Sequence, residues 1–414
     1  MKYVILYILV FASANLSQEN NWKDIDTFKN QSIFCIALNS KGYIFVGSWL
    51  GKLSVSSDNG ETWSVNNIAT IKNLIFCLNI NSEDYIFAGT IGGGIYRSTD
   101  DGNSWTYSGL NDYSVISIAS DSKNVLYAAT GGKSSAVFKS SDNGDTWNIS
   151  GTELENTNIQ ALAVNSKDQI FAGTLNGIFL SNDGGKTWIQ KNNGLTNTSV
   201  YSLGINSNDC IFAGTLYDGE IFYSRDSGES WINKSNASIK SFIRSFAFYN
   251  EKYILTASYD GIFRSDNTGD SWTALNDGSA DKMMLALVIN RDGIAYTGTW
   301  AHGAYKIFNP LLSADEKAIP EAFVLEQNYP NPFNPSTKIR YSIPASSFVR
   351  LKVYDILGNE IAVLVNEEKS PGIYEIVFSS QYPGGRQIPL SSGVYFYSLQ
   401  AGEFSSTKKF IILK

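Results

Sequence analysis

One motif recurs six times in the first two-thirds of the chain, and it constrains the fold more than any other feature. The motif reads Ser-x-Asp-x-Gly-x-Thr/Ser-Trp, and its first copy is SSDNGETW, which begins at Ser56. The tryptophans that close the six copies are 41 to 43 residues apart: Trp63, Trp105, Trp147, Trp188, Trp231 and Trp272. The chain is therefore built from repeated structural units of about 40 residues.

Each unit has the pattern of four short β-strands. In the first unit the strands are IFCIALN, YIFVGSW, KLSVS and a strand that begins at Thr62, with the turn sequences NSKG, GK and DNG between them. Four strands in about 40 residues is typical of one blade of a β-propeller. The composition agrees with an all-β protein, because 13% of the residues are aromatic and 35 are glycine.

The number of blades follows from an incomplete unit. Residues Met284 to Phe308 supply three strands but neither the motif nor a fourth strand. Trp22 lies 41 residues before Trp63 and so falls on the same period. We predict that the residues around Trp22 form the outer strand of the seventh blade, beside Ala304 to Phe308. This pairing closes the ring without an exposed sheet edge, which predicts a seven-bladed β-propeller over residues 18–308.

The motif residues have a local structural role. The acidic side chain can accept backbone N–H bonds across the turn, glycine permits a positive φ, and the indole can pack between neighbouring blades. The acidic position is occupied by Asp58, Asp100, Asp142, Asp183 and Asp226, with Asn267 in the sixth copy. Since asparagine also stabilises turns, we expect a structural role here rather than acid–base catalysis or calcium binding.

The motif resembles the Asp-box, or BNR, repeat. This repeat occurs in bacterial sialidases, sortilin-type receptors, xyloglucan-cleaving propeller hydrolases and photosystem assembly factors. The resemblance covers about Asn20 to Phe308 and implies a propeller of the sialidase-like superfamily. It leaves the function open, because the repeat occurs in enzymes and binding proteins alike.

The composition changes near residue 310, since all nine prolines lie at Pro310 or later. Residues 309–322 are expected to form a linker, and residues 323–414 contain short strands that predict an Ig-like β-sandwich. Two stretches, Asn328 to Pro344 (NYPNPFNPSTKIRYSIP) and Ser391 to Lys414, resemble the C-terminal sorting domain of type IX secretion cargo. The resemblance implies that the type IX secretion machinery is a partner. It also implies that the protein is secreted, or displayed on the outer surface of a Gram-negative bacterium.

The first residues have the pattern of a secretory signal peptide, which we place at residues 1–17. Lys2 precedes ten apolar residues, and Ala12-Ser13-Ala14 offers a cleavage site. Ten apolar residues are too few to span a bilayer, so we expect no membrane span in the mature chain. The net charge of -7 argues against nucleic acid and anionic membrane surfaces as partners.

We find no catalytic constellation and expect neither a metal nor a cofactor. His302 is the only histidine of the chain. A sialidase needs three clustered arginines, and of the five arginines in the propeller only Arg244 is placed to approach the channel or the ligand face. Whether the protein has enzymatic activity stays open at this point, with binding favoured.

The ligand face is expected on the loops that join the second and third strands of each blade and those that join consecutive blades. Aromatic residues of blades five, six, seven and one should form an arc there: Tyr217, Tyr259, Trp300 and Trp49, with His302 beside them. We expect this arc to stack on sugar rings or on a peptide, and its alternative role is packing between blades. The runner-up function is a glycoside hydrolase that uses loop carboxylates, and a passive envelope scaffold is a third. The candidate carboxylates are Asp218, Glu220, Asp260, Asp277 and Asp281.

Overall fold

The computed structural model divides the chain into two compact units, Met1–Leu311 and Leu312–Lys414. It describes residues 22–67, 73–132, 135–235, 237–249, 253–276, 283–308, 322–369, 372–380 and 390–413. The expected signal peptide, nearly all of the expected linker, and Asp277 and Asp281 lie outside these ranges. Within the described residues the regular structure is β-strand apart from two single 3-10 turns, and no helix there is long and apolar enough to cross a membrane.

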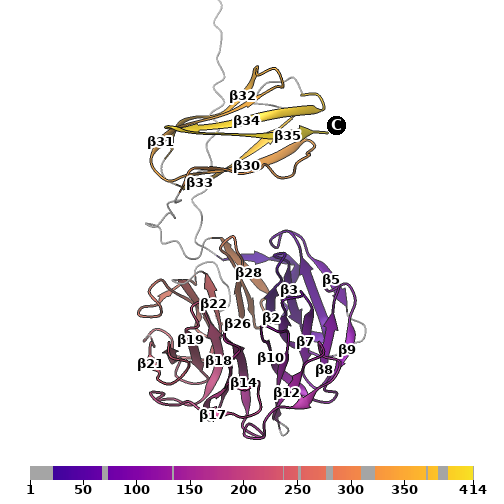
Figure 1. Cartoon of the computed structure of the whole chain (residues 1–414), viewed down its shortest axis with the longest axis vertical. Coiled ribbons are helices and arrows are strands. Elements are labelled where there is room, and N and C mark those ends of the chain that lie inside the picture. Colours follow the sequence, from indigo (N-terminus) through magenta and orange to yellow (C-terminus); the bar gives the residue numbers. More distant parts are fainter. Residues whose placement is uncertain are drawn as a thin grey trace, which may run out of the picture. The chain divides into compact units, whose positions relative to one another are not determined.

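The described part of the first unit contains seven four-stranded antiparallel sheets (Figure 1). In six of them the strands follow one another in chain order. Sheets 1 to 3 are β2 (Ile33–Leu38), β3 (Ile44–Ser48), β4 (Lys52–Ser56) and β5 (Ser64–Asn67); β6 (Ile75–Ile80), β7 (Ile86–Thr90), β8 (Gly94–Ser98) and β9 (Thr106–Gly109); and β10 (Ser114–Ser120), β11 (Leu126–Gly131), β12 (Val137–Ser140) and β13 (Asn148–Ile149). Sheets 4 to 6 are β14 (Ile159–Val164), β15 (Ile170–Thr174), β16 (Gly177–Ser181) and β17 (Ile189–Gln190); β18 (Val200–Ile205), β19 (Ile211–Thr215), β20 (Ile221–Ser224) and β21 (Ile232–Asn233); and β22 (Ile243–Tyr249), β23 (Tyr253–Ser258), β24 (Gly261–Ser265) and β25 (Thr273–Ala274).

Sheet 7 takes its strands from both ends of the first unit. It consists of β26 (Met284–Ile289), β27 (Ile294–Thr299), β28 (Ala304–Phe308) and β1 (Lys23–Ile25). In the register of β1 and β28, Lys23 lies opposite Lys306 and Ile25 opposite Ala304. The chain then passes through the turn η1 (Asp26–Phe28) toward sheet 1. The edge of β28 is therefore covered by the first described strand of the chain.

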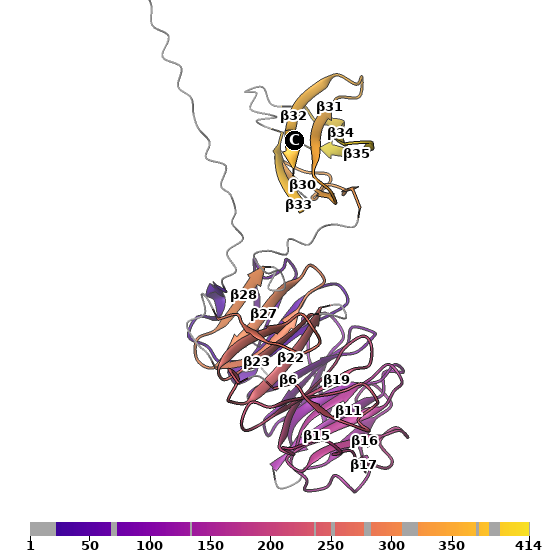
Figure 2. The same ribbon diagram turned by 90° about the vertical axis from the view of Figure 1, so that its left-hand side faces the viewer.

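The sheets close into a ring. The first strand of each sheet contacts the first strand of the next, in the order β2, β6, β10, β14, β18, β22 and β26, and β26 contacts β2 in turn. Figure 1 shows β2, β10, β14, β18, β22 and β26 toward the middle of the unit with the outer strands β5, β9, β17 and β21 at its periphery, and Figure 2 gives the perpendicular view with β6 labelled. This closed arrangement of radial four-stranded sheets is that of a β-propeller.

Small residues allow neighbouring sheets to approach each other closely. The residue that precedes the serine or threonine near the end of the second strand is glycine in five sheets and alanine in two. These residues are Gly47, Gly89, Gly173, Gly214 and Gly298, with Ala129 and Ala257. A Cβ atom on Gly298 would lie 2.5 Å from Cγ2 of Ile33 in the next sheet, and one on Gly89 would lie 2.8 Å from Val115. Glycine is required at these two positions by close packing rather than by a positive φ.

The second unit contains two sheets that share one hydrophobic core. One sheet has the order β29 (Val324–Leu325), β30 (Ser336–Ile343) and β33 (Gly372–Ser379). The other has the order β32 (Glu360–Lys369), β31 (Ser347–Tyr354), β34 (Gly393–Ala401) and β35 (Phe404–Ile412). Tyr341 and Phe378 of the first sheet belong to the same buried cluster as Val353, Tyr397 and Phe410 of the second. Hydrophobic packing between two antiparallel sheets therefore holds this unit together.

Candidate functional site

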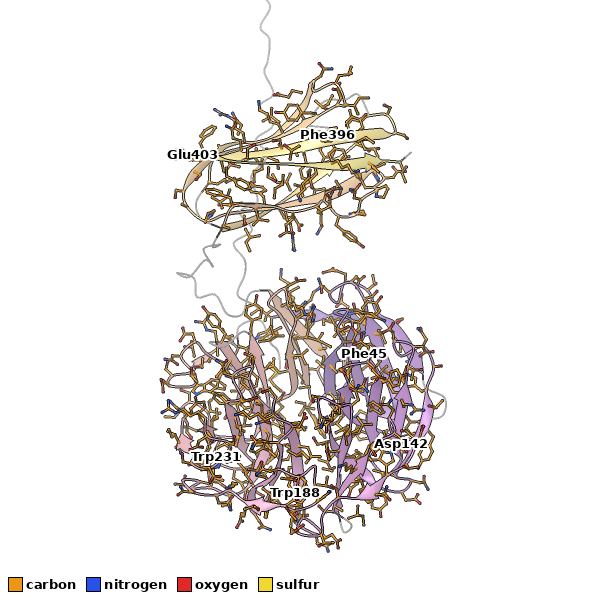
Figure 3. All side chains as sticks on the ribbon, viewed as in Figure 1. Phe45, Asp142, Trp188, Trp231, Phe396 and Glu403 are labelled. Carbon is orange, nitrogen blue, oxygen red and sulfur yellow. The ribbon has the colours of Figure 1, made fainter. Side chains whose placement is uncertain are left out.

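The repeated motif forms a hydrogen-bonded turn between the third and fourth strands of its sheet. In the third copy, Asp142 accepts hydrogen bonds from the Ser140 hydroxyl (2.6 Å), the Thr146 hydroxyl (2.6 Å) and the Thr146 backbone N–H (2.9 Å). Gly144 has a φ of 88°, and its N–H donates to the Ser140 hydroxyl. Figure 3 labels Asp142 toward the periphery of the first unit. The carboxylate therefore accepts its hydrogen bonds from residues of its own turn.

Four of the six motif tryptophans donate a hydrogen bond to the preceding sheet, whereas Trp63 and Trp105 donate to Gly60 and Gly102 in their own turns. The indole Nε1 of Trp147 donates to the carbonyl of Ser108 in the preceding sheet (2.7 Å), and that of Trp231 donates to Lys191 (2.8 Å). Trp188 and Trp272 make the same contact to Ser150 and Lys234. Trp22 lies outside any motif but donates to the carbonyl of Leu275 at 2.6 Å. Its indole therefore occupies the equivalent position in sheet 7.

The turn hydrogen bonds change the acidity of the motif carboxylates. Hydrogen bonds from the side chains of Ser140 and Thr146 lower the pKa of Asp142 from 3.8 to about 2. The Thr187 hydroxyl and backbone N–H, despite some opposing desolvation, lower the pKa of Asp183 to about 2 as well. Folding therefore lowers the pKa of both carboxyl groups. Their ionised forms stabilise the folded protein above about pH 4, and this stabilisation is lost as the pH falls toward 2.

We expect the double variant Asp142→Asn/Asp183→Asn to lose less stability between pH 5 and pH 2 than the native protein. Asparagine fits the turn, because Asn267 in the sixth copy accepts from the Ser271 N–H (2.9 Å) and donates to its hydroxyl (2.9 Å). Urea-unfolding midpoints over this pH range measure the difference. The reciprocal variant Asn267→Asp should make the fall steeper than in the native protein. If the unfolding midpoints of all three proteins fell in parallel with pH, the motif carboxylates would not be the source of this loss of stability.

The candidate ligand-binding aromatics lie at the other end of the sheets from these turns. In sheet 1 the motif turn begins after Ser56, which is paired with Ile44 at the start of β3, whereas Trp49 directly follows the end of β3 in the turn η2 (Trp49–Gly51). Trp300 and Tyr217 occupy the corresponding loops of sheets 7 and 5. The exposed fractions of Trp49, Trp300 and Tyr217 are 50%, 45% and 56%. The motifs and the aromatics therefore belong to opposite faces of the ring.

The predicted arc of aromatics consists of two pairs, each organised by a phenylalanine. Trp49 and Trp300 both contact the ring of Phe34 edge-on, with centroids 5.5 and 5.7 Å away. Tyr217 and Tyr259 both contact Phe242, at 5.9 and 4.8 Å. His302 is exposed in the loop of Trp300. Phe34 and Phe242 were absent from the sequence prediction, because their role depends on which loops the ring brings together.

A β-bulge at the start of every innermost strand adds a second layer to this face. In all seven sheets the register between the first and second strands shifts by one residue at the same position. The extra residues are Phe34, Phe76, Ile116, Gln160, Tyr201, Arg244 and Leu285. Bulges re-aim side chains and are common beside functional sites. The sequence does carry a sign of the bulge. The bulge residue differs in character from sheet to sheet, whereas the residue before it is apolar in all seven sheets.

Arg244 joins the two aromatic pairs. Its guanidinium lies 4.8 Å from the ring centre of Tyr201 and 5.9 Å from that of Phe76, and it donates a hydrogen bond to the Tyr201 hydroxyl. Tyr201 stacks on Phe242, and Phe76 lies 6.4 Å from Phe34. Sheets 6 and 2 are not neighbours in the ring, so the Arg244 side chain reaches across its middle. We call the continuous set Trp49, Trp300, Phe34, Phe76, Arg244, Tyr201, Phe242, Tyr217 and Tyr259 the aromatic track.

The loops that carry the track are held by hydrogen bonds. The backbone N–H of Trp300 donates to the carbonyl of Met283 (3.1 Å), and that of Tyr259 donates to Phe242 (3.3 Å). The loop carboxylates take part in this bracing. Asp260 accepts from the Lys240 N–H at 2.7 Å, and Glu220 accepts from Asn233 at 3.2 Å. Over the described residues, no three His, Cys, Asp or Glu side chains are grouped so that they could hold a metal ion.

The two units were compared with known proteins. The family model of the secretion system C-terminal sorting domain matches residues 327–413. The second unit carries a C-terminal sorting domain. This sorting domain implies that the chain is exported by type IX secretion, either into the medium or to the cell surface.

Solved structures resemble the chain in fold at low sequence identity. YCF48 from Cyanidioschyzon merolae is 14% identical with a TM-score of 0.57, and the match covers 70% of this chain and 100% of YCF48. PorZ, an essential surface component of the type-IX secretion system of Porphyromonas gingivalis, is 16% identical with a TM-score of 0.51 over 91% of this chain. The extracellular domain of BT4673 from B. thetaiotaomicron is 14% identical with a TM-score of 0.60 over 96% of this chain.

This chain spans only 59% of the PorZ and BT4673 chains. The comparison with curated proteins finds no match. These likenesses support a β-propeller fold for the first unit and say nothing about its ligand.

Proposed function

We propose that the protein is a secreted or surface-displayed seven-bladed propeller of Asp-box repeats that binds a glycan through the aromatic track. In this proposal a signal peptide at residues 1–17 directs the chain across the inner membrane. Residues 323–414 then form an Ig-like sandwich that serves export. Seven four-stranded sheets in a closed cycle and six hydrogen-bonded motif turns support the architecture.

The observation that carries the binding proposal is the exposure of two neighbouring indoles. Trp49 and Trp300 come from different sheets, remain about half exposed, and are held edge-on against one buried ring, Phe34. Large apolar side chains kept rigid and accessible on loops are typical of binding surfaces rather than of the core. Indole faces of this kind stack on the apolar faces of sugar rings, because both surfaces are flat and poorly hydrated.

Two of the five candidate loop carboxylates, Glu220 and Asp260, are engaged within the loops, which favours binding over hydrolysis. Glycoside hydrolysis needs two carboxyl groups free to face one glycosidic bond. Glu220 accepts hydrogen bonds from Thr196 and Asn233, and Asp260 accepts one from the backbone of Lys240. Both side chains thus hold the loops in place, which is a role in positioning the aromatic track.

We expect the double variant Trp49→Ala/Trp300→Ala to weaken binding to the best polysaccharide of a plant and microbial panel by at least tenfold. The loss reflects the removal of two desolvated stacking contacts. Isothermal titration of the purified protein gives the affinity, and assay of new reducing ends tests for cleavage in the same samples. Tyr107→Ala is the matched control, because Tyr107 is also 50% exposed but lies on the outer strand β9. Unchanged affinity in the double variant would overturn the proposal, and release of reducing ends by the native protein would replace it with hydrolysis.

A further inference from the structure

No acidic side chain among the described residues neutralises the charge of Arg244. Its guanidinium contacts the Tyr201 hydroxyl and the rings of Tyr201 and Phe76, and none of the described residues forms an ion pair with it. Its Nε atom is buried and has no acceptor among the described residues, and the hydrogen bond to Tyr201 is made by the terminal nitrogen Nη1. A partly buried guanidinium is normally matched by a carboxylate or by carbonyl oxygens, because desolvating an unpaired charge is costly.

The position of Arg244 in the ring indicates what kind of group could approach its guanidinium. Arg244 is a bulge residue of β22, and its side chain reaches across the ring toward β6. There it lies between the tryptophan pair on Phe34 and the tyrosine pair on Phe242. The flanking rings fix the guanidinium plane by cation–π contacts, and Tyr201 fixes one of its nitrogens. The fork geometry of a guanidinium suits a planar carboxylate better than the point charge of lysine does.

We propose that Arg244 and Tyr201 form an anion subsite that selects glycans bearing uronic acid carboxylates. This inference rests on the proposed glycan-binding function and names the class of glycan. The carboxylate of one sugar residue accepts from the terminal nitrogens of Arg244 while neighbouring residues stack on Trp49 and Trp300. The net charge of -7 opposes dense polyanions at long range. The subsite therefore suits a chain whose carboxylates are separated by neutral sugars.

The test compares matched pairs of ligands. Glucuronoxylan, alginate and polygalacturonate are each titrated against the full-length protein beside their carboxyl-reduced forms, which keep the sugar backbone and lose the charge. We expect the native protein to prefer one acidic form, glucuronoxylan foremost, by at least tenfold over its reduced form. In Arg244→Met the ratio of the two affinities should fall to about one, and in Tyr201→Phe it should fall part of the way. Arg350→Met is the control, because Arg350 also lies over an aromatic ring (Phe348, 5.0 Å) but belongs to the second unit.

The outcomes separate this inference from the proposed function. Equal affinity of the native protein for acidic and reduced forms, or a preference that survives in well-folded Arg244→Met, would overturn the anion subsite and leave glycan binding intact. Binding of a carboxylate-bearing peptide without binding of any polysaccharide would overturn both. A thermal melt of each variant shows that it is folded. Arg244→Lys keeps the positive charge but loses the planar guanidinium, so it should retain only part of the preference for the acidic form.

Discussion

Replacing Trp22 by alanine is expected to lower the free energy of unfolding of the first unit by about 3–5 kcal/mol. The indole is 3% exposed and packs in a cluster with Leu255, Met284 and Ile307. Its Nε1 also donates the hydrogen bond to Leu275 that holds sheet 7 against sheet 6. The substitution removes both the buried ring and this bond, and it loosens β1 from β28. Because all nine tryptophans lie between residues 22 and 300, tryptophan fluorescence during urea unfolding monitors the first unit alone.

Two further variants show whether the loss comes from closure of the ring. Trp22→Phe keeps most of the apolar contact and should cost about 1–2 kcal/mol less than alanine does. Trp49→Ala removes an indole that is 50% exposed and should change the unfolding midpoint little. If Trp22→Ala and Trp49→Ala unfold at the same urea concentration, the first described strand does not stabilise the ring.

Introducing a methyl group at Gly298 is expected to cost about 1–3 kcal/mol. A Cβ atom there would lie 2.5 Å from Cγ2 of Ile33 and 2.8 Å from the carbonyl oxygen of the same residue. A backbone oxygen cannot move away by changing a rotamer, so sheets 7 and 1 must separate. The Gly298→Val variant should lose more than Gly298→Ala, since it adds two further methyl groups to the same contact.

Sheet 6 provides the reciprocal experiment. The equivalent residue is Ala257, whose Cβ is accommodated there. Ala257→Gly should cost only about 0.5–1 kcal/mol, the usual penalty of glycine within a strand. The same urea titration compares the two changes. A Gly298→Ala protein as stable as the native one would show that the approach of the two sheets is adjustable and that glycine serves no packing purpose at this position.

The strands of the first unit were predictable because every repeat shows the same order of apolar runs and turn sequences. Six copies of one motif at a constant period place the turns, and the apolar runs between them place the strands. The period also singled out Trp22, whose indole lies at the site equivalent to that of Trp147 and Trp231. Local signals suffice here, since every strand pairs with a strand adjacent in sequence except β1 with β28.

The candidate site was only partly predictable. Counting from the repeat placed Trp49, Trp300, Tyr217 and Tyr259 on equivalent loops, but the distances between them depend on residues in other strands. The two tryptophans both pack against Phe34, whereas the two tyrosines both pack against Phe242. Arg244 was recognised as the one arginine placed to reach this face, and its contact with Phe76 of sheet 2 joins the pairs.

The sequence by itself determined the repeat, the strand pattern, the turn chemistry of the motifs and the sorting domain at the C-terminal end. All of these depend on residues within one unit of about 40 positions, or on one contiguous segment that resembles a known family. Only the tertiary structure decided which side chains meet in the middle of the ring. That meeting is set by how closely the sheets pack around the glycines and by the bulge that turns Arg244 and Tyr201 toward each other. Contacts between residues of sheets 6 and 2 leave no periodic trace in a sequence, because they depend on closure of the whole ring.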